Sequence, residues 1–255
     1  YNKPLPRWWL WLFIGTVIFA IIYLVLYPGF GKYAGVLGWN QNTDHAAAVQ
    51  AAEDKASAIM AQFDGKPLPT LVADLKAQSI GRNVFANNCA TCHGSDARGN
   101  PGFPNLADND WIWGGQPDQV LNSILNGRNA VMPALGAALG DEGVSEVVAY
   151  VRSLSDLPHD RRAAEAGSAR FATICVACHG ADGKGNPALG APNLTDDIWL
   201  YGSEPATIAE AINYGRNGQM PAHGPIIGEQ RARLVAAYVL HLSQGSEAPS
   251  TGGQQ

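Results

Sequence analysis

The chain is poor in charge and in sulfur. Only 15% of its 255 residues are charged, the formal net charge is −5, and there are four cysteines and three methionines. The acidic balance argues against nucleic acid as a partner, because nucleic-acid-binding domains carry a surplus of Lys and Arg. No stretch shows sustained alternation of apolar and polar residues, so the sequence predicts an all-α fold. The chemistry of the chain is then expected at its few sulfur atoms.

One stretch has no charge at all. From Trp8 to Tyr27 there is no acidic, basic or histidine residue, and about 20 apolar residues cross the hydrocarbon core as a helix. Tryptophans gather at its start and tyrosines at its end, as at the two membrane interfaces. A signal peptide would have a shorter apolar core and a small-residue cleavage site. We therefore expect a transmembrane anchor within residues 1–30, in contact with lipid.

The charges beside this anchor predict its orientation. Lys3 and Arg7 precede it and Lys32 follows it, and the side richer in Lys and Arg usually stays in the cytoplasm. The rest of the chain would then lie in the periplasm, on the outer side of a bacterial inner membrane. Because the chain starts at Tyr1 rather than Met, further residues can precede it.

All four cysteines fall in one motif that occurs twice. Residues 89–93 and 175–179 both read C-x-x-C-H. Two thiols at this spacing can add to the two vinyl groups of a haem, and the histidine that follows supplies the proximal imidazole. The sequence therefore predicts two covalently bound haem c groups, with these attachment and proximal residues: Cys89, Cys92, His93, Cys175, Cys178 and His179.

Other uses of paired cysteines fit less well. A redox-active C-x-x-C sits beside a strand–helix–strand pattern and does not need the histidine. A four-cysteine zinc site usually has its two pairs about 15–20 residues apart, much closer than here. Two structural disulfides would leave the paired histidines unexplained.

The surroundings of the motif repeat as well. The segments 94–101, 104–108, 126–133 and 149–154 recur as 180–187, 192–196, 214–221 and 237–242. Self-similarity of this kind indicates two tandem copies of one small domain. In each copy we expect a helix leading into C-x-x-C-H, a middle helix, a loop carrying Met-Pro and a closing amphipathic helix.

Met132 and Met220 occupy the same position in the two copies. A thioether in the sixth position makes the iron six-coordinate, stabilises its ferrous form and blocks oxygen or peroxide. We expect both to be axial ligands rather than core fillers, with His223 as the rival ligand in the second copy. The sequence leaves open whether each methionine binds the haem of its own copy.

Four further residues at equivalent positions are candidates for contacts to haem propionates: Arg128, Arg216, Trp113 and Tyr201. An arginine can pair with a propionate carboxylate, and an indole N–H or a phenol hydroxyl can hydrogen-bond to one. The alternative is that they are ordinary surface or packing residues.

Residues 79–155 and 166–243 resemble class I cytochrome c domains, with C-x-x-C-H, Pro-Asn-Leu and Met-Pro in the same order. With an anchor that begins Pro4-Leu5-Pro6-Arg7-Trp8-Trp9, the chain resembles the dihaem subunit of cbb3-type cytochrome c oxidases. The resemblance implies an electron relay that is not catalytic by itself. A soluble periplasmic cytochrome c would donate the electrons, and a monohaem cytochrome c subunit would take them to the haem–copper subunit that reduces oxygen.

Two other functions stay open at this point. One is an anchored dihaem carrier that serves a dehydrogenase or another complex; the other is a dihaem peroxidase, which needs an open iron and so conflicts with two Met-Pro segments. The expected division of the chain is an anchor at 1–30, a periplasmic linker with a helix at 31–78, cytochrome c domains at 79–157 and 158–245, and a flexible tail at 246–255.

Overall fold

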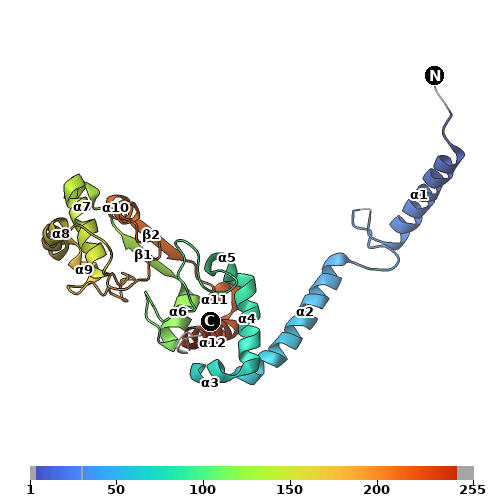
Figure 1. Ribbon diagram of the computed structural model, residues 1–255. Helices are drawn as coiled ribbons and strands as arrows, with labels where there is room; N and C mark the ends of the chain where they lie inside the picture. The colour runs from blue at the N-terminus through green and yellow to red at the C-terminus, as the bar shows by residue number, and fades with distance from the viewer. Residues whose placement is uncertain (1–3, 30, 246–255) are drawn as a thin grey trace, which may run out of the picture. The chain divides into compact units, whose positions relative to one another are not determined.

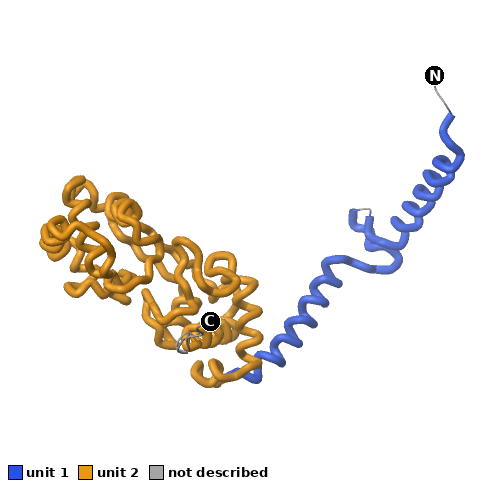
Figure 2. Tube along the Cα trace, viewed as in Figure 1, with its two compact units in different colours: residues 1–64 blue, residues 65–255 orange. Residues whose placement is uncertain are grey.

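The structure is a computed structural model that describes residues 4–29 and 31–245; Lys3 and the expected tail 246–255 lie outside them. The chain divides into two compact units, residues 1–64 and 65–255 (Figure 2). Helices dominate both units (Figure 1). The first unit holds α1 (Arg7–Leu26), α2 (Gln41–Met60) and the 3-10 turn η1 (Ala61–Phe63). The second holds α3 (Leu68–Ala73), α4 (Leu75–Asn88), α5 (Ala90–His93), α6 (Pro117–Asn126), β1 (Arg128–Met132), α7 (Gly136–Leu154), α8 (Arg161–Ile174), α9 (Val176–His179), α10 (Pro205–Tyr214), β2 (Arg216–Met220), α11 (Gly224–Ile227) and α12 (Glu229–Gly245).

Helix α1 is apolar on every face. It spans 20 residues, none of them buried, and it is long and apolar enough to cross a membrane. A helix in water would have one polar face. The exposed tryptophans and aliphatic side chains of α1 would be stabilised by lipid, because removing apolar surface from water is strongly favourable.

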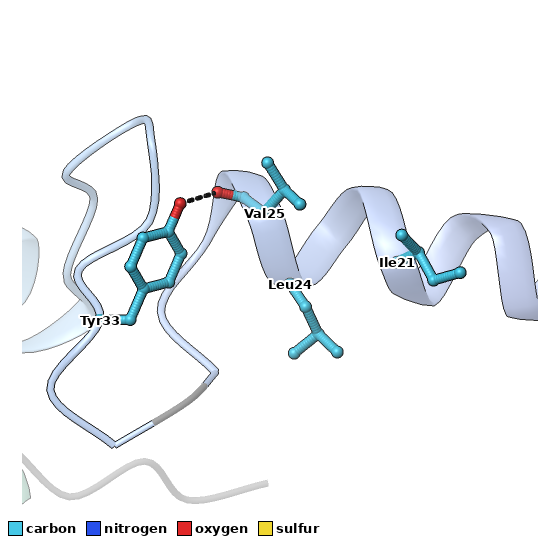
Figure 3. Close-up of a pocket in the computed structure, with 4 residues that line it drawn as sticks. All are labelled: Ile21, Leu24, Val25 and Tyr33. Carbon is cyan, nitrogen blue, oxygen red and sulfur yellow. Dashed lines mark hydrogen bonds between the residues drawn. The ribbon is translucent and has the colours of Figure 1, made fainter.

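The segment after α1 folds back and caps the end of that helix. The Tyr33 hydroxyl donates to the Val25 carbonyl at 2.9 Å (Figure 3). The amides of Val36 and Leu37 donate to the carbonyls of Val25 and Leu26, at 3.0 and 3.1 Å. The last carbonyls of a helix have no partner within it, so these bonds satisfy groups that would otherwise be exposed at the edge of the apolar stretch.

In the second unit the two sequence repeats exchange their closing helices. Helix α12 packs on α4 and also contacts α3 and α6, whereas α7 packs on α8 and α10 (Figure 1). The rings of Phe85 and Tyr238 lie 5.6 Å apart at the first crossing, and those of Tyr150 and Phe171 lie 5.1 Å apart at the second. The expected boundary between residues 157 and 158 separates the repeats along the chain, but the packing contacts cross it.

Two equivalent glycines allow these helix pairs to approach closely. A Cβ at Gly81 in α4 would overlap the Leu234 carbonyl oxygen of α12, and a Cβ at Gly167 in α8 would overlap the Glu146 carbonyl oxygen of α7. Backbone contact of this kind is available only where the side chain is missing. The two glycines therefore set the separation of the exchanged helices.

The segments that carry Met-Pro, expected to be loops, are instead strands. Strands β1 and β2 form an antiparallel ribbon in which Ala130 pairs with Gly218 at the centre. The glycine before each strand, Gly127 or Gly215, has a φ near +70°, which only glycine adopts readily. The expectation was wrong because five-residue strands that pair with a distant copy of themselves leave no long alternating pattern. The ribbon joins the two halves of the unit.

Candidate haem-binding sites

Each C-x-x-C-H forms a single helical turn at the end of a longer helix. Cys89 is the C-cap residue of α4, and Cys175 is the C-cap residue of α8. The four residues that follow each of them form the short helices α5 and α9. Residues three apart on a helix are neighbours on one side of it, so the two thiols of each pair lie together. The first cysteine of each pair is half-buried and the second is exposed. At least one thiol of each pair is therefore accessible at the surface.

The histidine of each motif is oriented by a backbone carbonyl. The distance from His93 Nδ1 to the Pro104 carbonyl oxygen is 3.1 Å, and that from His179 Nδ1 to the Pro192 carbonyl oxygen is 3.2 Å. Burial lowers the pKa of both imidazoles, against the opposing effect of these hydrogen bonds. A neutral ring that donates from Nδ1 presents the lone pair of Nε2, the arrangement required of a metal ligand.

The first cysteine of each pair is held in its neutral thiol form. Burial raises the pKa of Cys89 to about 11, and it also raises the pKa of Cys175; the neighbouring thiol of each pair adds to the effect. All four cysteines are free, and residues 4–29 and 31–245 contain no group of three or more His, Cys, Asp or Glu side chains that could hold a metal ion.

Met132 lies near the second C-x-x-C-H, and the loop that follows Met220 lies near the first. Met132 packs against the apolar cluster that also holds Phe171 and Cys175, beside the second motif. At the other end of the ribbon, His223 follows Met220 by three residues and lies near His93. Its charge adds to burial, the main cause, in lowering the pKa of His93. The amide of His223 donates to the Ile124 carbonyl of α6 at 2.9 Å, which holds this loop against the first half.

The four candidates for propionate contacts also gather at the ribbon. The Arg128 guanidinium lies over the Trp113 ring at 4.9 Å, and that of Arg216 lies over the Tyr201 ring at 4.8 Å. In the ladder Arg128 pairs with Met220, and Arg216 pairs with Met132. Each end of the ribbon therefore presents one methionine and one arginine that come from different copies.

These residues fit a c-type haem. Paired free thiols, a neutral imidazole with its Nε2 available and a nearby thioether are the donors that such a haem takes. Buried Arg216 Nε finds no hydrogen-bond partner among the described residues, and a buried donor of this kind calls for an acceptor. A propionate carboxylate would provide one.

Sequence reasoning missed the residues that hold the two arginines. Arg128 Nε donates to the Ser123 hydroxyl at 2.8 Å, whereas Arg216 Nη1 pairs with the Glu210 carboxylate at 2.8 Å. Both partners lie near the end of the helix that precedes the strand. The aligned repeats contain the signal, since Asn122-Ser123 in one copy stands where Glu210-Ala211 stands in the other.

Fold and site together define a c-type cytochrome with an apolar N-terminal helix. The family described as "Cytochrome C oxidase, cbb3-type, subunit III" matches residues 76–151 and again residues 162–239. The N-terminal domain of cytochrome oxidase-cbb3, FixP, matches residues 1–34. The chain belongs to the subunit III family of cbb3-type cytochrome c oxidases.

Curated relatives agree over nearly the whole chain. It is 47% identical over 246 residues to the cbb3-type cytochrome c oxidase subunit CcoP of Rubrivivax gelatinosus, a match covering 96% of this chain and 81% of the relative. It is 41% identical over 263 residues to subunit FixP of Azorhizobium caulinodans, covering 96% and 89%. These matches confirm the resemblance, the all-α fold with a membrane helix and tandem cytochrome c domains, and haem c as the cofactor.

Proposed function

We propose that this chain is the membrane-anchored electron-transfer subunit of a cbb3-type terminal oxidase and that it holds two haem c groups. The observation that carries the proposal is the doubled site. In each copy, two thiols and an oriented imidazole lie together at a single helical turn. A methionine from the other copy, at one end of the β1–β2 ribbon, is proposed to complete each site. Family membership and the apolar helix α1 support a place in the same membrane as the oxidase.

The two sites exchange their methionines in this proposal. His93 and Met220 would hold one iron, and His179 and Met132 the other. The packing of Met132 beside Cys175 supports the second pair. The nearness of His223 to His93 and the bond from the His223 amide to α6 support the first. The interleaved packing of α12 on α4 and of α7 on α8 points the same way.

The residues of each site would hold a haem with both axial positions of its iron occupied. Bound haem would supply a one-electron couple. His93 and His179 would provide neutral imidazoles, whose rings are fixed by the Pro104 and Pro192 carbonyls. A methionine thioether as the second ligand would exclude water and oxygen and favour the ferrous form. A site of this kind passes an electron with little rearrangement and without binding a substrate.

The anchor and the family support a proposed orientation and a set of partners. Arg7 precedes the apolar stretch, and the positive-inside tendency supports a periplasmic place for the residues after α1. A soluble periplasmic cytochrome c would then donate electrons, and the monohaem and haem–copper subunits would receive them. The acidic chain suits a donor with basic residues around its haem edge, because complementary charge mainly speeds encounter.

The experiment that tests this function is purification in mild detergent from the native membrane, by a tag on this chain. A reduced-minus-oxidised spectrum and an oxygen electrode then report on the preparation. We expect b-type haem beside the c-type bands, two haems c per chain by mass, and oxygen uptake with a reduced cytochrome donor. The control is a known membrane complex that stays intact in the same detergent.

Two other results would overturn the proposal. If only c-type haem appears and no oxygen is consumed, the anchored carrier for another complex replaces the oxidase subunit. If the isolated chain turns over peroxide and shows a high-spin iron, the dihaem peroxidase replaces both. A mass that corresponds to one haem would exclude the dihaem relay itself.

A further inference from the structure

The two arginines at the ends of the ribbon have unequal charge partners. The Glu210 carboxylate pairs with Arg216 Nη1 at 2.8 Å, so a negative charge compensates this guanidinium. Arg128 has neutral acceptors instead. Its Nε donates to the Ser123 hydroxyl at 2.8 Å, and its Nη2 donates to the Gln119 carbonyl at 3.2 Å.

The position equivalent to Glu210 in the first copy is occupied by Asn122. With its amide oxygen toward the guanidinium, Asn122 accepts from both terminal nitrogens of Arg128, at 3.1 and 3.2 Å. The two copies therefore hold their arginines in the same place with side chains of similar size and different charge. The two surroundings differ by one negative charge and by the Ser123 hydroxyl, in whose place the second copy has Ala211.

Each arginine belongs to a different redox site. Arg216 pairs in the ladder with Met132, which packs beside Cys175. Arg128 pairs with Met220, whose loop reaches His93. Because the strands alternate, the arginines and the methionines all lie on the half-buried face of the ribbon. The net charge at each end is thus felt on the side where the haem is held.

We infer that Glu210 lowers the reduction potential of the haem attached at Cys175 and Cys178 relative to the haem attached at Cys89 and Cys92. This inference rests on the proposed function and on its exchanged ligands. Reduction adds an electron, so an uncompensated cation beside a haem stabilises the reduced form, and a carboxylate paired with that cation weakens the effect. This contribution shifts the equilibrium between the two haems toward reduction of the first.

The expected size is modest because Glu210 is exposed. Its side chain has 56% of its surface accessible, against 24% for Arg216, and water and salt screen such pairs. An exposed ion pair changes an equilibrium constant by about two- to fivefold. We expect the equilibrium constant for electron transfer from the second haem to the first to fall by that factor in Glu210→Gln.

The experiment is a redox titration of the purified full-length protein, followed in the c-type bands and fitted to two components. Glu210→Gln should raise the potential of one component, that of the haem at Cys175 and Cys178, and leave the other in place. Asn122→Glu should lower the potential of the other component and leave the first in place. The swap variant, Glu210→Asn with Asn122→Glu, should shift the two components in opposite directions. Glu204→Gln, which removes a charge at the N-cap of the same helix, is the matched control and should move neither component.

Opposite results separate this inference from the proposed function. If Glu210→Gln moves neither component, moves both equally, or moves the same component as Asn122→Glu, the assignment of Glu210 is wrong while the dihaem relay still stands. If the purified chain carries one haem or does not co-purify with the oxidase, the proposed function is wrong whatever the titration shows.

Discussion

Met132 and Arg216 face each other across the β1–β2 ribbon although 84 residues separate them (216 − 132). The first belongs to one sequence copy and the second to the other, and both lie on the half-buried face. The two strands have the same length and pair in antiparallel register, so the equivalent pair, Arg128 and Met220, lies at the opposite end of the ribbon. The ribbon therefore makes the two redox sites parts of one folding unit.

Exchanged ligation can be tested by double substitutions that count intact sites. If His179 and Met132 hold the same iron, His179→Ala with Met132→Ala damages one site and leaves the other whole. In the matched control, His93→Ala with Met132→Ala, both sites lose a ligand. The sulfur-to-iron charge-transfer absorption of the ferric protein, with the low-spin EPR signal, reports the number of intact His–Met haems. The first variant should keep about half of this signal and the second almost none. The reverse result would show that each methionine serves its own copy.

The helix crossings should be sensitive to side-chain volume at their glycines. Gly167→Val places branched carbons against the Glu146 carbonyl of α7, and forced overpacking of this kind costs about 1–3 kcal/mol. We expect a lower thermal midpoint and weaker haem retention. Gly218→Ala is the control, because nothing lies within 4 Å of an added Cβ there. Equal stability of the two variants would argue against the close crossing.

Much of this architecture could be predicted from the sequence. The anchor follows from the uncharged stretch Trp8–Tyr27, and the attachment sites follow from Cys-x-x-Cys-His, where local spacing determines the chemistry. The exchange of α7 and α12 could not be predicted, because both copies have a similar apolar pattern, which does not say on which opening helix a closing helix packs. The ribbon was missed for a related reason: a strand such as Arg128–Met132 is stabilised by a partner far away along the chain. The ion pair between Glu210 and Arg216 was not predicted, although aligning the two copies shows that Glu210 stands where Asn122 stands in the other copy.

Interleaved packing predicts that one sequence copy is not stable alone. A chain cut to residues 79–157 keeps Cys89, Cys92 and His93 but loses α12, which packs on α4, and loses Met220. Its apolar α4 face would be exposed to water, which is strongly unfavourable. We expect no cooperative thermal transition and no low-spin haem. Joining residues 65–133 to residues 216–245 restores the partners of α4 and serves as the comparison. A stable, six-coordinate 79–157 fragment would contradict the exchange.

A cluster of carboxylates makes stability depend on pH. Burial raises the pKa of Asp110, and the charges of Asp196 and Asp108 raise it further. Since the folded state then holds the proton more tightly than the unfolded state, stability falls as pH rises from the ordinary value of 3.8 through the raised pKa. At neutral pH the cost is fully present.

Asp110→Asn should remove this cost. We expect a thermal midpoint higher by about 1–2 °C at neutral pH, a size in keeping with a small charge effect in a unit of this length. The difference should disappear below the ordinary pKa, where the aspartic acid is neutral in both states. Glu165→Gln, at an exposed position of α8, removes the same charge away from the cluster and should leave the midpoint nearly unchanged. A stabilisation that is equal at acid and neutral pH would point to packing and not to charge as its cause.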